Sequence, residues 1–106
     1  MSYDITIQVE HAEIWYGSPT YNFGPMLREA FKTNSLENGI KDLNGMRAGW
    51  VAQLLDDAIF HMRQHPEVYK PLEAENGWGT YEQCIEFLEE FRQQCQRVPK
   101  HGMVIV

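Results

Sequence analysis

Cysteine is scarce in this chain: only Cys84 and Cys95 occur among 106 residues. Both fall in one stretch with helical periodicity, where their spacing corresponds to about 16 Å along the axis at about 1.5 Å per residue. A disulfide requires two α-carbons within about 7 Å of each other, so no intrachain bridge is expected. A chain without disulfides is typical of a reducing compartment, and the expected location is the cytoplasm.

Long apolar runs are also missing. No segment of about 18 consecutive apolar residues occurs, so the sequence predicts no transmembrane helix. The first ten residues, MSYDITIQVE, lack a basic region followed by an apolar stretch, and no signal peptide is expected. The sequence therefore predicts no membrane partner.

Positive charge is the third shortage. The chain has 9 Lys and Arg against 15 Asp and Glu, a formal net charge of −6 and a pI near 5.1. Nucleic-acid-binding proteins neutralise phosphates with clustered cations, whereas the basic residues here are scattered, which argues against a nucleic-acid partner. A hydrophobic fraction of 43% and a charged fraction of 23% are ordinary for a folded protein, and the length predicts one domain over residues 1–106.

Strand signals occur at both ends of the chain. Residues 4–10, DITIQVE, alternate apolar and polar side chains, which predicts a half-buried strand. The next segment, HAEIWYG, continues in the opposite phase, as a bulge or bend near His11 would produce. The final GMVIV favours a strand that pairs with the first one. The side chains expected on one side are Ile5, Ile7 and Val9 in the first segment, and Ala12, Ile14 and Tyr16 in the second.

Three segments have apolar residues at the spacing of amphipathic helices. The first covers residues 25–32 and begins with Pro25, whose fixed φ suits a first helical position. The others cover about residues 46–65 and 80–97, and one short strand is expected around 39–43. The apolar stripes are Met26, Leu27, Ala30 and Phe31; Trp50, Val51, Leu54, Leu55, Ala58, Ile59 and Met62; and Cys84, Phe87, Leu88, Phe91 and Cys95.

Together these elements predict the α+β class. A small antiparallel sheet, in which the N-terminal strand or hairpin pairs with the C-terminal strand, is expected to pack against three helices. A sheet of this kind has a free edge, so self-association through that edge is a further hypothesis.

The stretch ENGWGTYEQC at the start of the last helix raises the question whether its Gly-x-Gly binds phosphate. A dinucleotide fingerprint needs a third glycine and a P-loop needs Gly-Lys-Ser/Thr, and neither is present. Thr80 and Gln83 instead have the spacing of a capping box, and no Lys or Arg occurs between residues 71 and 91. We therefore expect a structural turn, with Trp78 folded onto the core.

Two groups of residues in the predicted helices could carry chemistry. Asp57, His61 and His65 recur at every fourth position, which is a spacing that can offer ligands to a metal. The favoured alternative is an edge hydrogen bond plus a partly buried histidine, with His65 closest to the centre of the apolar stripe. Cys84 lies in a first helical turn, where a thiol can become reactive, but its place on the apolar stripe favours core packing.

Aromatic residues are concentrated in the segment HAEIWYGSPTYNF, half strand and half loop. Such a cluster is typical of a protein-binding surface or a small-ligand pocket, and equally of the rim of a small core. The last helix has an acidic outer face that a basic partner could contact, although most such faces are simply solvated. The candidate contact residues are Trp15, Tyr16, Tyr21, Asn22 and Phe23 in the aromatic segment, and Glu82, Glu86 and Glu89 on the helix.

Two sequence elements carry a resemblance. TYNFGPM contains Tyr21, Asn22, Pro25 and Met26, and NGWGTYE covers residues 76–82. In this combination the chain resembles a family of small proteins from phages, prophages and bacteria. The resemblance implies a phage or accessory-gene setting, in which small acidic proteins bind and block host proteins. It implies no catalytic residue.

The sequence therefore favours a non-enzymatic protein-interaction module with a protein partner and no cofactor. The alternative hypothesis is a metal-dependent hydrolase or small-ligand-binding protein that uses Asp57, His61 and His65.

Overall fold

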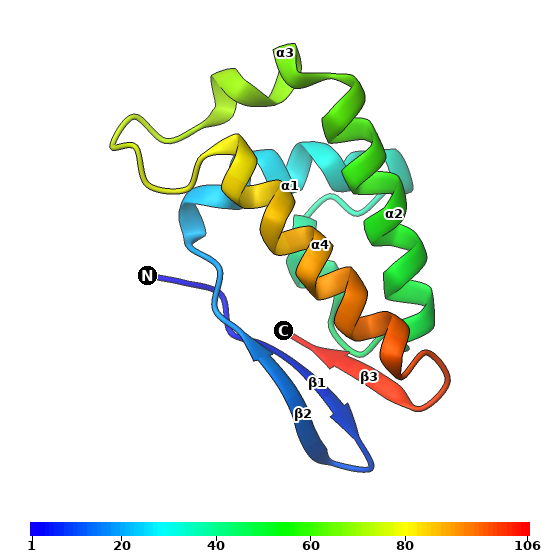
Figure 1. Cartoon of the computed structure of the whole chain (residues 1–106). Helices are drawn as coiled ribbons and strands as arrows, with labels where there is room; N and C mark the ends of the chain where they lie inside the picture. The colour runs from blue at the N-terminus through cyan, green and yellow to red at the C-terminus, as the bar shows by residue number, and fades with distance from the viewer.

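The computed structural model describes residues 1–106 and combines a three-stranded sheet with four α-helices (Figure 1). This confirms the α+β class, with one helix more than expected. The strands are β1 (Ile5–Val9), β2 (Ala12–Gly17) and β3 (Gly102–Ile105). The α-helices are α1 (Gly24–Phe31), α2 (Ala48–Gln64), α3 (Pro66–Tyr69) and α4 (Tyr81–Arg97), and the 3-10 turns are η1 (Tyr21–Phe23), η2 (Lys32–Asn34), η3 (Gly39–Leu43) and η4 (Lys70–Leu72).

The sheet has the order β2-β1-β3, and both pairings are antiparallel. The N-terminal hairpin therefore pairs with the C-terminal strand, as the sequence predicted. Ile7 pairs with Trp15 on one side and Val104 on the other, which places these three side chains in one row across the inner face. Ile7 and Val104 are fully buried, so this row forms the contact between the sheet and the helices.

The phase of β2 differs from the sequence-based expectation. Glu10 and His11 both have positive φ, 50° and 71°, and they form the two-residue turn between β1 and β2. The register then shifts between Ile7 and Gln8, whose partners are Trp15 and Glu13. This bulge adds Ile14 to the strand. Ile14 and Tyr16, which were expected on the same side as Ile5 and Ile7, are instead 42% and 50% exposed.

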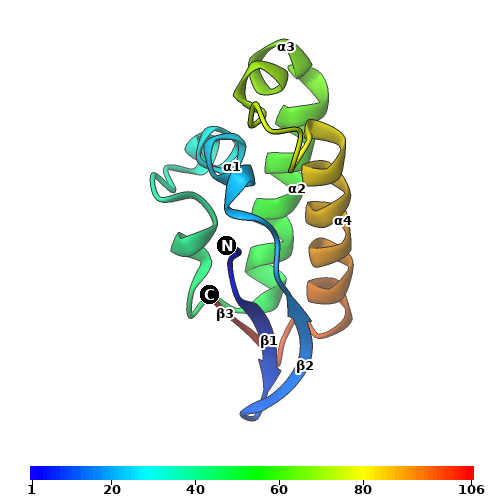
Figure 2. The ribbon, with the colours of Figure 1, turned by 90° about the vertical axis from the view of Figure 1, so that its left-hand side faces the viewer.

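The core lies between the sheet and the long helices. In Figures 1 and 2, α2 and α4 run side by side in opposite directions, and the β1–β2 hairpin extends beyond them. One cluster of 26 buried residues includes Val51, Leu55 and Met62 from α2, and Leu88 and Phe91 from α4. None of the helices is both long enough and apolar enough to cross a membrane.

The turn into α4 is built as a capping box. Thr80 Oγ1 accepts from the Gln83 N–H, and Gln83 Oε1 accepts from the Thr80 N–H. Trp78, expected on the core, is instead 73% exposed. Gly79 approaches the η1 segment so closely that an added Cβ would lie 3.0 Å from Thr20 Cγ2. The backbone of Gly79 therefore packs there, and Trp78 extends outward.

Three other expectations were wrong. Residues 39–43 form the 3-10 turn η3 and not a strand. Trp50, at the margin of the buried stripe in the first turn of α2, is 55% exposed. His65 was expected to be partly buried because it continued the apolar stripe of the helix, but it is exposed. The helix ends at Gln64, and the φ of His65, −131°, is no longer helical.

Candidate functional site

A groove runs between α4 and the segment that joins β2 to α1. We call it the α4 groove; its volume is about 420 Å³. It brings together parts of both surfaces that the sequence singled out, the aromatic segment and the last helix. The lining residues are Trp15, Tyr16, Gly17, Ser18, Pro19, Thr20, Phe23, Gln83, Phe87 and Glu90.

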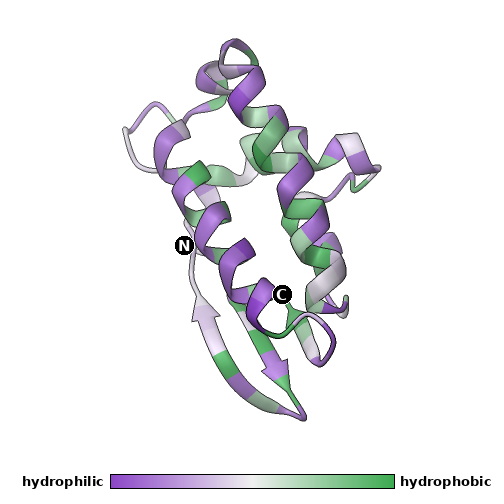
Figure 3. Cartoon of the chain, turned by 45° about the vertical axis from the view of Figure 1, so that its right-hand side comes forward, coloured by the Kyte–Doolittle hydropathy of each residue, from purple (hydrophilic) through white to green (hydrophobic).

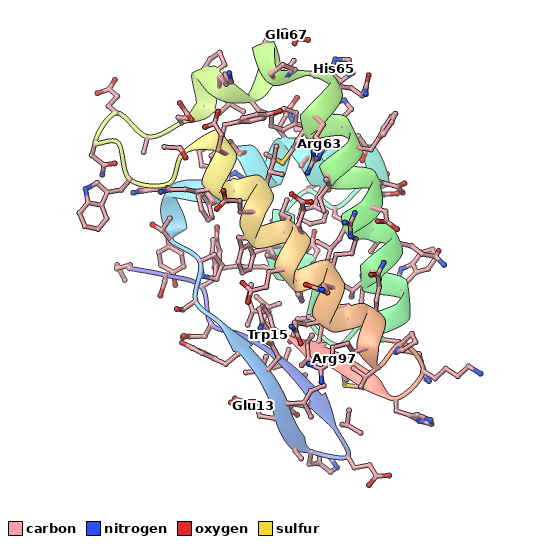
Figure 4. All side chains as sticks on the ribbon, viewed as in Figure 1. Glu13, Trp15, Arg63, His65, Glu67 and Arg97 are labelled. Atoms are coloured by element: carbon pink, nitrogen blue, oxygen red, sulfur yellow. The ribbon has the colours of Figure 1, made fainter.

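Trp15 is held in the floor of the α4 groove by aromatic stacking. Its ring centroid lies 5.3 Å from that of Phe91 at an interplanar angle of 14°, and 6.4 Å from that of Phe87. Gly17 makes room for the indole, since an added Cβ would lie 2.5 Å from Trp15 Cη2. Figure 4 shows Trp15 between β2 and α4. Stacked aromatic rings of this kind give a rigid apolar floor.

The exposed face of α4 is acidic, and one of its carboxylates reaches the groove. Glu82, Glu86 and Glu90 recur at every fourth position of α4, are exposed, and have no ion-pair partner. Figure 3 shows the outward face of α4 as largely hydrophilic. Glu90, which was not among the predicted contact residues, lines the groove directly. Glu89 was predicted to be a contact residue but is paired with Arg63 of α2 at 2.6 Å.

The other contact residues predicted in the aromatic segment lie in different surroundings. Phe23 is buried and contributes its ring to the groove wall, 6.4 Å from Phe87. Tyr21 points away from the groove and packs edge-on against Tyr3, at a centroid distance of 4.7 Å. Asn22 lies against the Gly79 backbone. Tyr16 donates a hydrogen bond to Asp4 Oδ1 at 2.6 Å, and this bond raises the pKa of its phenol.

The histidine group is only partly assembled. The rings of His61 and His65 are 4.5 Å apart, but no hydrogen bond joins Asp57 to either ring, and no three metal-binding side chains gather anywhere in the chain. His61 Nδ1 is the only partner of the buried Tyr69 hydroxyl. The Tyr69 O–H needs an acceptor, so we assign this role to Nδ1 of neutral His61 and its ring proton to Nε2. In this tautomer Nε2 cannot bind a metal.

Both cysteines are buried and unpaired. Burial raises the pKa of the Cys84 and Cys95 thiols to about 12. A buried thiol that stays protonated is a poor nucleophile, even in the first turn of a helix. The packing interpretation of Cys84 thus agrees with its surroundings.

This burial predicts a loss of stability at high pH. An unfolded thiol ionises from about pH 9, whereas the folded one stays neutral up to about pH 12. The unfolding free energy should therefore be insensitive to these thiols below about pH 9 and fall above it, by about 1 kcal/mol per pH unit for each thiol. Urea unfolding between about pH 8 and 11 measures the slope. The Cys84→Ala/Cys95→Ala double variant should have a shallower slope, and an unchanged slope would contradict the prediction.

Comparisons of the chain with protein-family models, with curated proteins and with solved structures gave no match. The resemblance to phage and prophage proteins therefore depends on the two sequence elements alone.

Proposed function

We propose that this protein is a non-enzymatic interaction module that binds an extended, basic segment of a partner protein in the α4 groove. The observation that carries the proposal is the combination, in one groove, of a stacked aromatic floor with the unpaired carboxylate of Glu90, one helical turn from the exposed Glu86. Apolar side chains of the segment would lie on Trp15 and Phe87, and its Lys or Arg side chains would meet Glu86 and Glu90.

The free edge of the sheet supports an extended conformation for this segment. In the order β2-β1-β3, β2 has a paired neighbour on one side only. The backbone N–H and C=O groups on its other side are available to a further strand, a common mode of peptide recognition. The bulge at Ile14 interrupts β2. The residues best placed to pair are thus Trp15 to Gly17, beside the groove.

The resemblance noted above suggests that the partner is a bacterial protein. A phage-encoded inhibitor would act by occupying the surface of its host target, and this requires no catalytic group. The alternative of a metal-dependent hydrolase has no comparable support, because Asp57 does not join the neighbouring rings of His61 and His65 in a group of three ligands.

Charge reversal in the groove tests the proposal. The wild-type protein, Glu90→Lys and Glu75→Lys are immobilised and exposed to a bacterial extract. Glu75 is an exposed residue outside the groove, so its variant carries the same change of net charge. We expect a protein retained by the wild type and by Glu75→Lys to be lost by Glu90→Lys. With the purified partner, calorimetry should show affinity weakened about tenfold or more by Glu90→Lys alone.

Two outcomes would contradict the proposal: no protein retained by the wild type, or equal retention by all three forms. Hydrogen exchange in the purified complex then tests the binding mode. Amides of β2 should exchange more slowly when the partner is bound. Protection of α4 without protection of β2 would support binding in the α4 groove and contradict the pairing of the partner segment with β2.

A further inference from the structure

A second cavity, which shares no residue with the α4 groove, lies between the N-terminal segment, α1 and η3. We call it the Arg28 pocket. Its volume is about 420 Å³, within the range of small-ligand sites. The five lining residues are Tyr3, Tyr21, Arg28, Asn38 and Lys41. None of them is acidic, although the chain as a whole carries a formal net charge of −6.

The two cations of the pocket are without partners, which is unusual in this chain. Of the nine Lys and Arg residues, six have an ion pair, a hydrogen bond or an aromatic ring as partner: Lys32, Arg47, Arg63, Lys70, Arg92 and Arg97. The three without one are Arg28, Lys41 and Lys100, and two of these line the same cavity. A carboxylate close to it, that of Asp42, is not part of the lining and accepts two hydrogen bonds from Asn38.

The Tyr3 hydroxyl is a third unpartnered donor. Only 9% of Tyr3 is exposed, and its hydroxyl makes no hydrogen bond within the chain. A Cβ added to Gly24 would lie 3.2 Å from Tyr3 Oη and 3.1 Å from Arg28 Nη1, so both groups meet above this glycine. Burial raises the pKa of the Tyr3 phenol, which keeps it protonated and able to donate. The hydroxyl itself is open to the cavity, since Thr6 Oγ1 is the only buried side-chain polar atom without a partner, so Tyr3 can donate to a ligand in the pocket.

The local backbone holds this arrangement in place. The Tyr3 N–H donates to Pro19 O at 2.8 Å, which fixes the N-terminal segment beside η1. Gly39 has a φ of +66°, and a Cβ there would lie 3.3 Å from the Arg28 backbone nitrogen. This glycine therefore allows η3, which carries Lys41, to pack directly against α1. The pocket is a product of the fold and not of one loop.

We propose that the Arg28 pocket binds a phosphate monoester. A guanidinium, an ammonium and a phenol O–H supply donors for the phosphoryl oxygens, and the two cations balance a dianion. The cavity is larger than a bare phosphate, and the exposed ring of Tyr21 offers a surface for the organic part of the ester. This site is independent of the partner segment proposed for the α4 groove.

Titrations with inorganic phosphate, ribose 5-phosphate and adenosine monophosphate test the proposal, followed by calorimetry and by NMR shifts of the pocket residues. All three should bind at millimolar concentration or better. Equal affinities would mean that the phosphoryl group alone is recognised, and tighter binding of the nucleotide would place its base on Tyr21. Either result supports the site. Absence of binding by all three at tens of millimolar would overturn it.

Variants locate the binding. Arg28→Gln should weaken it by about tenfold or more, since it removes the planar fork of donors. Lys100→Gln is the matched control: it removes the same charge from the third unpartnered cation, outside the pocket, and should change nothing. Gly24→Ala should also weaken binding because its methyl group would crowd Arg28 and Tyr3. Equal loss in Arg28→Gln and Lys100→Gln would indicate general charge attraction and overturn the proposal.

Discussion

Phe91→Ala is expected to lower the free energy of unfolding by about 3 to 5 kcal/mol, a large part of the total for a domain of this size. Phe91 is fully buried and lies at the centre of the α4 contact with the sheet. The Trp15 ring stacks on it at 5.3 Å, and the Phe87 ring centroid is 5.9 Å away. Removing the phenyl ring would leave a cavity and deprive Trp15 of its support.

Urea unfolding measures this loss, and fluorescence reports Trp15 specifically. Trp50 and Trp78 are already exposed, so a red shift in a Trp50→Phe/Trp78→Phe background comes from Trp15 alone. Gln93→Ala, an exposed position of the same helix, is the control and should stay within about 0.5 kcal/mol of the wild type. A loss below about 1 kcal/mol for Phe91→Ala would show that the sheet does not rest on this ring.

Gly102→Ala should be strongly destabilising although it adds a single methyl group, with an expected loss of about 2 to 3 kcal/mol. Gly102 begins β3, and its N–H donates to Val98 O at 2.8 Å. An added Cβ would lie 2.6 Å from Val98 Cγ2, 2.8 Å from Val98 O and 3.0 Å from Ala48 Cβ. The side chain of Val98 can move, whereas the carbonyl oxygen is fixed by the end of α4.

A double-mutant cycle separates these two contacts. Val98→Ala combined with Gly102→Ala removes the clash with Cγ2 but leaves the one with the carbonyl oxygen, so only part of the stability should return. Met103→Ala, at an exposed position of the same strand, should have an effect below about 0.5 kcal/mol. A Gly102→Ala protein as stable as the wild type would contradict the close contact between Gly102 and the Val98 carbonyl oxygen at the end of α4.

The sequence predicted the elements better than the positions of their large side chains. Periodicity located α2 and α4 because each buries a stripe of several residues, and the Thr80–Gln83 spacing marked the start of α4. Trp78 was misplaced because left-handed glycines on both sides of it, with φ of 75° and 86°, turn the chain outward. No periodic pattern encodes a turn of that kind.

The candidate site was also predicted only in part: its segments were identified, but their arrangement in space was not. The aromatic segment and the last helix were each identified, but their meeting in one groove depends on the bulge at Ile14, which turns Trp15 toward α4. The Arg28 pocket gave no sequence signal, since its residues are far apart in the chain and ordinary in type. A shortage of partners for Arg28 and Lys41 becomes visible only when all ion pairs can be counted in three dimensions.

The pairing of β1 with β3 also bears on the order of folding. Thr6 pairs with Ile105, so almost the whole chain lies between the two strands that complete the sheet. Bringing together ends that are so distant costs chain entropy, and such contacts form slowly unless the intervening segment is already condensed. We expect α2 and α4 to dock first, and the last strand to add to the hairpin only after the helices have shortened the distance it must cross.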